Sequence, residues 1–326
     1  MSYSLVPKIA GVALLALSSW AQAQTAASYP DRPVTIIVPF AAGGASDILA
    51  RQVGKRLTEV LGQSFIADNR VGAGGAVGAR TVARAVPNGY TLVMGTNASH
   101  AIAATMNKNL GYDPLRNFAP ISLVAHVPQI LMVNPSLPVN NVRELIAYAK
   151  ANPGKLNFSS AGNGTPGHLG MELFKIMAGV EMTHVPYNGG GPGLLALAGG
   201  QVDVMADNVN SALPQIKAGK VKAIAVTTSR RSSALPDLAT VAEQALPGFD
   251  SGSWFALFAP ADTPKDIVAK LNVEVVKALN VPEVRATLLA QGAEPSPGAP
   301  EDLTKLMRDD IEKWQRVVDK IGLKAE

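Results

Sequence analysis

The sequence predicts a two-lobed α/β protein with a ligand cleft between the lobes. Two stretches, residues 34–100 and 156–227, each alternate short β-branched runs with helical patterns, which is typical of a parallel sheet covered by helices. From residue 264 onward the chain reads only as helix, so the last helices are expected to pack on the first sheet. That return requires two crossings between the lobes and leaves a cleft where ligands usually bind.

The first lobe begins with the stretch V-T-I-I-V-P-F-A-A-G-G-A-S-D at 34–47. Its β-branched run is long enough for a buried strand, which Pro39 ends, and two glycines turn the chain into a helix that Ser46 and Asp47 can cap. A strand, a glycine turn and a helix N-terminus present backbone N–H groups to an anion. The other elements predicted here are a helix at 46–61, strands at 64–67 and 91–95, a helix ending near 85, and a polar loop at 96–100.

The second lobe repeats this pattern with two more glycine turns. Residues 160–168, S-A-G-N-G-T-P-G-H, follow a strand at 156–159 and open a helix at 169–177. The glycines at 189–191 open a helix that ends at 198. Other predicted strands are at 121–124 and 129–133, on either side of a proline-marked bend, and at 183–187, 202–206, 221–227 and 253–258. Other predicted helices are at 142–150, 264–279, 282–291 and 301–321.

The first 23 residues have the pattern of a secretory signal peptide. Lys8 precedes the apolar run Ile9–Leu17, and Ala21-Gln22-Ala23 is a small-x-small site, so cleavage is expected after about Ala23. The apolar run is too short to span a bilayer, which makes a retained anchor the weaker alternative. The expected organisation is a signal peptide at 1–23, lobe 1 at 24–125 plus 255–326, and lobe 2 at 126–254, in a soluble exported protein.

Composition and motifs argue against several classes of function. The formal net charge is +4 and the basic residues are scattered without interleaved aromatics, so no nucleic acid partner is expected. The chain has no cysteine, which excludes thiolate chemistry. Gly162-x-Gly164-x-x-Gly167 matches the dinucleotide fingerprint, but the next strand ends in Tyr187-Asn188 rather than in an acid. No cofactor is therefore expected.

Candidate catalytic and metal-binding residues each have a plainer interpretation. The sequence contains neither G-x-S-x-G nor S-x-x-K. His168 and Glu172 have the spacing of a metal pair on a helix, but without a third ligand a helix-face pair or a cap is the better interpretation. Asp47 could contact a ligand, act as a general base, or cap its helix. Asp207 could face the cleft or form an Asx turn.

Six stretches of the chain are shared with a known family. They are Y-P-D-R-P-V-T-I-I-V-P-F-A-A-G-G-A-S-D, N-R-V-G-A-G-G-A-V-G-A, S-A-G-N-G-T-P-G-H-L-G-M-E, H-V-P-Y-N-G-G-G-P, the run Gly200–Asp203, and L-P-D-L-A-T-V-A-E-Q. In these stretches the chain resembles the Bug-type extracytoplasmic receptors, the solute-binding proteins of tripartite tricarboxylate transporters. The resemblance extends from Tyr29 to Lys324. It implies a type II periplasmic binding protein fold that holds a carboxylate between loops of both lobes, mostly through backbone N–H groups and ordered water.

The resemblance also implies which residues bind the ligand. The first loop corresponds to Phe40, Ala42, Gly43, Gly44 and Asp47. The second loop corresponds to Ser159, Ala161, Gly162, Asn163, Gly164 and Thr165, with His168 behind it. The cleft rim corresponds to Asn97, Ser99, Tyr187, Gly189 and Asp207. Two positions depart from the usual family pattern, because Asn188 stands where lysine is frequent and Ala206 where an aromatic residue is frequent. Both changes would leave room for a bulky or aromatic acid.

The expected function is capture of a small carboxylate, such as a di- or tricarboxylate, an amino acid or an aromatic acid. A monomeric periplasmic receptor would close on it by a hinge and deliver it to membrane permease subunits. Two alternatives remain open. An exported hydrolase or lyase on the same scaffold could use Asp47, His168 or Asp207 as a base, and a ligand sensor could contact a membrane signalling partner. Carboxylate capture by a receptor needs no catalytic residue and no metal.

Overall fold

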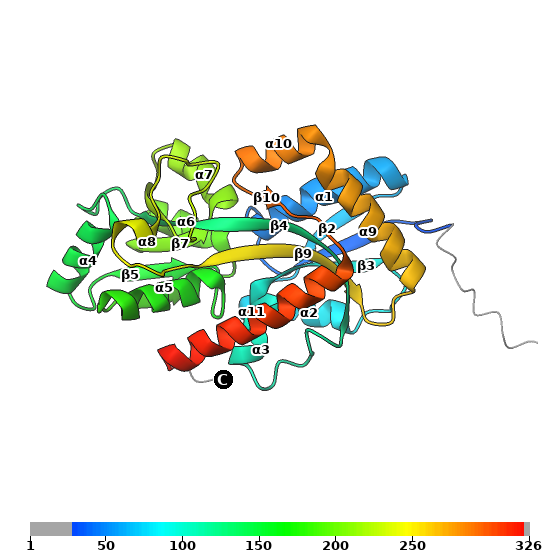
Figure 1. Cartoon of the computed structure of the whole chain (residues 1–326), viewed down its shortest axis with the longest axis horizontal. Coiled ribbons are helices and arrows are strands. Elements are labelled where there is room, and N and C mark those ends of the chain that lie inside the picture. Colours follow the sequence, from blue (N-terminus) through cyan, green and yellow to red (C-terminus); the bar gives the residue numbers. More distant parts are fainter. Residues whose placement is uncertain (1–27, 323–326) are drawn as a thin grey trace, which may run out of the picture.

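The computed structural model describes residues 28–322, which form an α/β fold with two lobes (Figure 1). Within these residues ten strands belong to one sheet, in the order β2-β1-β3-β9-β4-β7-β5-β6, with β8 and β10 pairing with β4 off this path. The strands are β1 (Val34–Val38), β2 (Phe65–Asn69), β3 (Thr91–Thr96), β4 (Phe118–Val133), β5 (Asn157–Ser160), β6 (Thr183–Pro186), β7 (Val204–Asn208), β8 (Lys222–Val226), β9 (Gly252–Pro260) and β10 (Glu294–Pro295). The predicted α/β class with two lobes is confirmed.

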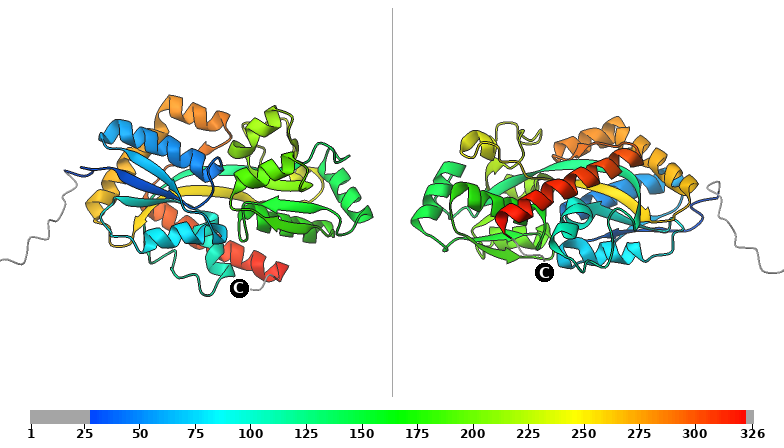
Figure 2. Two further views of the ribbon diagram at one scale, coloured as in Figure 1. Left: turned by 180° about the vertical axis from the view of Figure 1, so that it is seen from behind. Right: turned by 60° about the horizontal axis from the view of Figure 1, so that its bottom comes forward.

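The helices cover both faces of this sheet (Figures 1 and 2). They are α1 (Ala45–Leu61), α2 (Ala76–Ala83), α3 (Ala103–Met106), α4 (Val142–Ala151), α5 (Pro166–Ala178), α6 (Gly190–Ala198), α7 (Val209–Lys217), α8 (Val241–Gln244), α9 (Lys265–Asn280), α10 (Pro282–Ala290) and α11 (Pro300–Ile321). A 3-10 turn, η1 (Ala73–Gly75), precedes α2, and a π-helical turn, η2 (Ala98–Ile102), precedes α3.

The side chains of β1 show why the first lobe has three layers. Ile36 and Val38 lie in one core cluster with residues of α1 and α9, whereas Ile37 lies in another with residues of α2 and α11. Successive side chains of a strand point to opposite faces, so a continuous β-branched run is buried only in a sheet covered on both sides. β1 is parallel to both β2 and β3, as the predicted βαβαβ order requires.

Two long strands, β4 and β9, pass from one lobe to the other (Figure 1). β4 pairs with β9 as far as Pro128 and with β7 from Gln129 onward, antiparallel in both cases. The prediction of two separate strands around a proline-marked bend is therefore wrong. Pro128 has no N–H to donate, but it lies where β4 changes partner, so the missing hydrogen bond falls at the junction of two ladders.

Two other predictions made from local patterns are also wrong. The expected polar loop at 96–100 contains the start of η2, whose residues are all buried. Ser99 is satisfied inside the fold, because its Oγ donates to Thr96 O and its carbonyl oxygen accepts from Tyr112 Oη at 2.6 Å. Asn97 Oδ1 and His100 Nε2 have no partner among the described residues. The C-terminal region, expected to be only helical, contributes the short strand β10, which pairs with β4 through Glu294 and His126.

The C-terminal helix α11 runs along one side of the molecule and contacts both lobes (Figure 2, right). It packs on β4, η2 and α3, and it also reaches α5. Trp314 and Met307 are buried in the cluster of the first lobe, and Asp310 accepts a hydrogen bond from Trp254 Nε1 at 2.8 Å. The last helices therefore pack on the first sheet as expected, and α11 extends beyond it.

In the described part of the chain, every helix is too short or too polar to cross a bilayer. The predicted signal peptide at 1–23 lies outside the described residues.

Candidate functional site

The two lobes enclose a cavity at the ends of β1, β3, β5 and β7. Its volume is about 450 Å³ counted with the space open to solvent, but only about 40 Å³ can hold the centre of a water molecule. A site for one water needs roughly 10–15 Å³ on this measure. The lobes are therefore closed on a narrow space with room for a few waters.

Four helices of eight residues or more have their N-termini at this cavity, namely α1, α5, α6 and α7. The N-cap residues Gly44, Gly189 and Asn208 make no side-chain hydrogen bond to the first turn of α1, α6 and α7. The N–H groups of a first turn have no partner inside the helix, and each N-terminus carries about half a positive charge. Together these helix ends form a site for an anion without a cationic side chain.

Asp207 is the one ionisable residue among the described residues that line this cavity. Its side chain is 2% exposed, and Ser211 Oγ donates to Oδ2 at 2.9 Å. The carboxyl group lies against Gly190, where an added Cβ would come within 2.2 Å of Oδ2. Burial raises the pKa of Asp207 to about 6, against the opposing effect of hydrogen bonds from Asn208 and Ser211. An anionic ligand would thus be bound by neutral donors beside an acid.

The glycine loops of the two lobes are in direct contact. Ala41 N–H donates to Asn188 O at 3.1 Å. Gly74 lies so close to Asn163 that an added Cβ would be 2.2 Å from the Asn163 carbonyl oxygen. Gly74 also has φ +61°, a conformation that favours glycine. The absence of a side chain at Gly74 therefore lets the two loops approach each other across the cleft.

The structure places the predicted site residues in three groups. Six of them line the cavity, namely Phe40, Gly44, Asn97, Ala161, Thr165 and Asp207. Five line two adjoining hollows, namely Gly162, Asn163, Tyr187, Gly164 and His168. Six are not part of the cavity wall, namely Ala42, Gly43, Asp47, Ser99, Ser159 and Gly189. Their role in binding a ligand remains a prediction.

Eleven further residues line the cavity that the sequence did not single out as ligand contacts, namely Ala45, Ser46, Thr96, Ala98, Gln129, Pro166, Gly167, Gly190, Asn208, Ser253 and Phe255. Gly190 could have been found, because it is the first residue of the helix that the glycine run opens. Gln129 gave no signal, because its place at the cavity depends on the pairing of β4 with β7. Ala206, expected to enlarge the cleft, lies instead in the core of the second lobe, so that expectation is wrong.

Asp47 lies beside the cavity and holds the first loop in place. Its carboxylate accepts hydrogen bonds from Gly43 N at 3.1 Å, from Arg51 Nε at 3.0 Å and from Asn69 Nδ2 at 3.1 Å. Asn69 Nδ2 also donates to Phe40 O at 2.8 Å. Burial acts to raise the pKa of Asp47, but the hydrogen bonds from Arg51, Gly43 and Asn69 outweigh it and leave the pKa below its usual value. Asp47 therefore links α1, β2 and the loop.

Asp47→Asn is expected to lower the free energy of unfolding by about 1–2 kcal/mol at pH 7, because charge-assisted hydrogen bonds become neutral ones. Urea denaturation measures the loss. Because the folded pKa lies below the ordinary value of 3.8, the stabilisation is present above that value and disappears as the pH falls through the folded pKa. Asp68→Asn is the control, since it breaks an exposed pair with Arg70 worth at most about 1 kcal/mol. Equal losses in the two variants would contradict this role of Asp47.

A stacked pair of histidines lies behind the second glycine loop. The rings of His168 and His184 are 3.9 Å apart at 11°, and His184 also stacks on Phe158. Gly164 N donates to His168 Nδ1 at 3.2 Å, and His184 Nε2 lies 2.7 Å from Ser160 Oγ. Burial lowers the pKa of His168 to about 4 and that of His184 to about 3. The pair is therefore neutral at pH 7 and supports the loop from behind.

The predicted pair of His168 and Glu172 on one helix face is not formed, because His168 stacks on His184. Glu172 pairs with Lys175 at 2.8 Å rather than sharing a site with His168. Over residues 28–322, no three side chains of the histidine, cysteine, aspartate and glutamate types gather where they could hold a metal ion.

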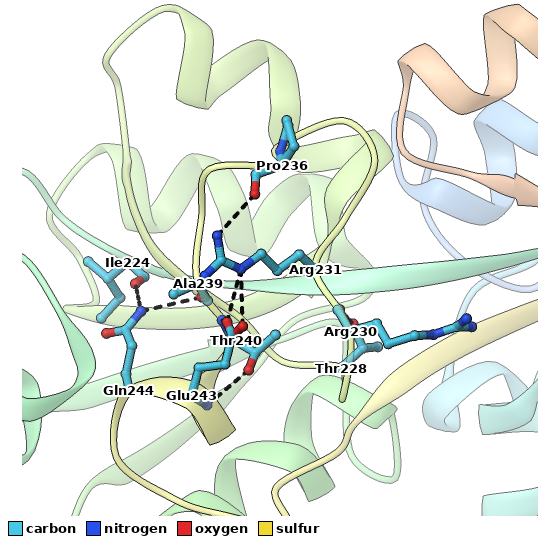
Figure 3. Close-up of polar contacts among 9 residues, drawn as sticks. All are labelled: Ile224, Thr228, Arg230, Arg231, Pro236, Ala239, Thr240, Glu243 and Gln244. Carbon is cyan, nitrogen blue, oxygen red and sulfur yellow. Dashed lines mark hydrogen bonds and ion pairs between the residues drawn. The ribbon is translucent and has the colours of Figure 1, made fainter.

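The Arg230-Arg231 pair does not form a basic patch (Figure 3). Arg231 forms an ion pair with Glu243 at 3.1 Å and donates to Pro236 O. Glu243 in turn closes a capping box with Thr240 at the start of α8. The side chain of Arg230 points away from Arg231, and its backbone carbonyl accepts a hydrogen bond from Thr228 Oγ1 at 2.8 Å. One arginine is thus neutralised locally.

A family model, a related protein and two solved structures all assign the chain to one family of receptors. The model of the tripartite tricarboxylate transporter family receptor, TctC, matches residues 49–323. The protein BugT of Bordetella pertussis is 35% identical over 303 residues, which cover 93% of each chain. The structure of R. palustris Rpa4515 with adipate is similar with a TM-score of 0.89 and 41% identity, covering 90% of this chain and 98% of that one. MatC from Rhodopseudomonas palustris with bound malate has a TM-score of 0.85 and 38% identity, covering 89% of this chain and 100% of that one. The resemblance seen in the sequence is thereby confirmed, and the chain belongs to the Bug-type receptor family of the tripartite tricarboxylate transporters.

Proposed function

We propose that this protein captures a small organic carboxylate in the periplasm and delivers it to the permease subunits of a tripartite tricarboxylate transporter. The observation that carries the proposal is the meeting of four helix N-termini at a cavity whose described lining includes no lysine, arginine or histidine. Such helix ends bind an anion through backbone N–H groups. The adipate of Rpa4515 and the malate of MatC support a carboxylate as that anion.

Closure of the two lobes is the proposed mechanism of capture. The change of partner of β4, between Pro128 and Gln129, supports lobes that divide near residues 125 and 126, with lobe 1 at 24–125 plus 255–326 and lobe 2 at 126–254. The contact between Ala41 and Asn188 holds the closed state. Closure removes water, which strengthens the hydrogen bonds to a bound carboxylate, and the closed receptor is the form that a permease would recognise.

A receptor without catalytic residues is favoured over a hydrolase or lyase. Such an enzyme needs at least two groups that act on the same substrate, such as a base with an acid or a nucleophile. Asp207 is the one acid or base at the described cavity wall. Asp47 is engaged by Arg51 and Asn69, and His168 is stacked on His184.

Titration calorimetry against a panel of small carboxylates tests the proposal. At least one acid is expected to bind with a Kd of about 10⁻⁶ M or tighter, which corresponds to about 8 kcal/mol. Small-angle scattering should show a more compact particle when the acid is added. Mass spectrometry should recover the acid unchanged after incubation, whereas conversion to a product would favour the enzyme. A folded protein that binds none of the acids would contradict the proposal.

A further inference from the structure

One wall of the cavity carries three buried residues with hydrogen-bond acceptors, and in two of them the acceptor has no donor in the described part of the chain. This acceptor wall consists of Asn97, Gln129 and Asp207, each 2% exposed. Asn97 Nδ2 donates to Gly252 O at 3.0 Å, which fixes the amide and leaves Oδ1 as an acceptor. Within the described residues, neither Asn97 Oδ1 nor Gln129 Oε1 has a hydrogen-bond partner. A buried acceptor without a donor costs about 1–3 kcal/mol, so the wall favours a ligand that donates.

Asp207 adds a third acceptor to this wall and is the acid that faces a bound anion. One of its oxygens, Oδ2, accepts from Ser211 Oγ, and its carboxyl also accepts from the backbone of Asn208. No charged group acts on it, and its pKa is set by burial and by these hydrogen bonds. The ionisable residues on the elements around it are His126 on β4, His168, Glu172 and Lys175 on α5, Lys217 on α7, and Asp47, Arg51, Lys55, Arg56 and Glu59 on α1.

A second carboxylate placed against this wall would meet an acid and two acceptors. Two carboxyl groups at hydrogen-bond distance can share a site only when one of them holds a proton. A hydroxyl or an ammonium group in the same place would instead supply the missing donor. The two sides of the cavity thus have opposite requirements, since the helix N-termini attract negative charge and the acceptor wall attracts a donor.

We propose that Asp207, together with Asn97 and Gln129, selects carboxylates that carry a hydrogen-bond donor as their second polar group. This inference rests on the proposed capture of a carboxylate and specifies which acids are captured. The donor is a hydroxyl, an ammonium or a protonated second carboxyl group. A plain dicarboxylate binds by taking up one proton, which it shares with Asp207.

Two matched sets of acids distinguish these donors by titration calorimetry on the full mature protein. The first set is succinate, malate and aspartate, and the second is adipate, 2-hydroxyadipate and 2-aminoadipate. At pH 8 the hydroxy acid and the amino acid of each set are expected to bind about tenfold more tightly than the plain dicarboxylate. This factor corresponds to about 1.4 kcal/mol of binding free energy. Lowering the pH from 8 to 6 should tighten the plain dicarboxylate by up to about tenfold per pH unit.

Asp207→Asn tests the residue itself, because asparagine keeps the shape and can still accept from Ser211 while its amide N–H donates to a carboxylate. The variant is expected to bind the plain dicarboxylate at least about tenfold more tightly at pH 8 and with little dependence on pH. Asp310→Asn is the control. It replaces another buried acid, which is bonded to Trp254 rather than to the cavity, and it should leave the selectivity unchanged.

The outcomes separate this inference from the proposed function. Equal affinities within a set, with a flat pH profile in the wild-type protein, would overturn the inference and leave carboxylate capture standing. Absence of binding by every acid would overturn both. The series of acids and of pH values on the wild-type protein does not depend on the folding of the variant, which circular dichroism checks separately.

Discussion

Gly74→Ala is expected to weaken ligand binding by about 10- to 100-fold, which corresponds to about 1.4–2.8 kcal/mol. In the closed protein an added Cβ would lie 2.2 Å from the carbonyl oxygen of Asn163, across the cleft. That oxygen belongs to the backbone, so relief requires the loops to separate. The clash exists only when the lobes are closed, and the substitution therefore raises the free energy of closure. Titration calorimetry measures the loss, with the acid that binds the wild-type protein most tightly.

Gly179→Ala is the matched control for the backbone strain that alanine introduces at Gly74. Gly179 has φ +62°, against +61° for Gly74, and an added Cβ there would meet no atom within 4 Å. Both variants are expected to lose about 1 kcal/mol of unfolding free energy, because alanine at positive φ is strained. Only Gly74→Ala should lose affinity. If both variants bind as the wild-type protein does, the contact between Gly74 and Asn163 does not limit closure.

The sequence predicted well those strands and helices whose start and end are marked by residues within the same segment. The β-branched run at 34–38 and the glycine turn after it predicted β1 and α1 to within a residue or two. The strand predicted at 156–159 is also correct to within one residue, whereas the helix after it begins at Pro166, three residues before the predicted start. Each of these segments carries its own periodicity and its own glycine, so neither depends on a distant partner.

Features that depend on distant partners were not visible in the sequence. Pro128 indicates a bend, but pairing with β9 on one side and β7 on the other keeps β4 continuous. The polar residues of η2 read as a loop because Tyr112, which bonds to Ser99, lies 13 residues away. The local conformation that a residue favours is adopted only where the pairing with neighbouring strands allows it.

The two acidic candidates illustrate the same limit within the site. From the sequence, Asp47 and Asp207 were both open between contacting a ligand and shaping the backbone. Arg51 and Asn69 decide the structural role of Asp47, because they occupy its carboxylate. Asp207 receives donors from Ser211 and Asn208 but lies at the cavity wall. The positions of Asp47 on α1 and Asp207 near the end of β7 could be predicted from the sequence, whereas the neighbouring groups that contact each carboxyl group could not.

Acid is expected to destabilise the protein through the stacked pair His168 and His184. Their folded pKa values, about 4 and about 3, lie below the ordinary value of 6.5. The unfolded chain therefore binds more protons than the folded one between pH 6.5 and 4, and stability falls as the pH drops through that range. Each pKa unit corresponds to about 1.4 kcal/mol, so His168 alone accounts for a loss of about 3 kcal/mol by pH 4.

The variant His168→Gln separates this effect from other acid-induced changes, because glutamine keeps an acceptor for Gly164 without titrating. Urea denaturation at pH 7, 6, 5 and 4 is expected to show a smaller acid-induced loss in this variant than in the wild-type protein. His126→Gln is the control, since His126 takes no part in the stack. Burial also lowers the pKa of His126, but its side chain is exposed, so this variant should change the acid-induced loss less than His168→Gln does. Parallel pH profiles for the wild-type protein and His168→Gln would exclude the stack as the source of acid sensitivity. A smaller loss would instead link the neutral state of His168 to the loop that it supports, since Gly164 N–H can donate to Nδ1 only while that nitrogen carries no proton.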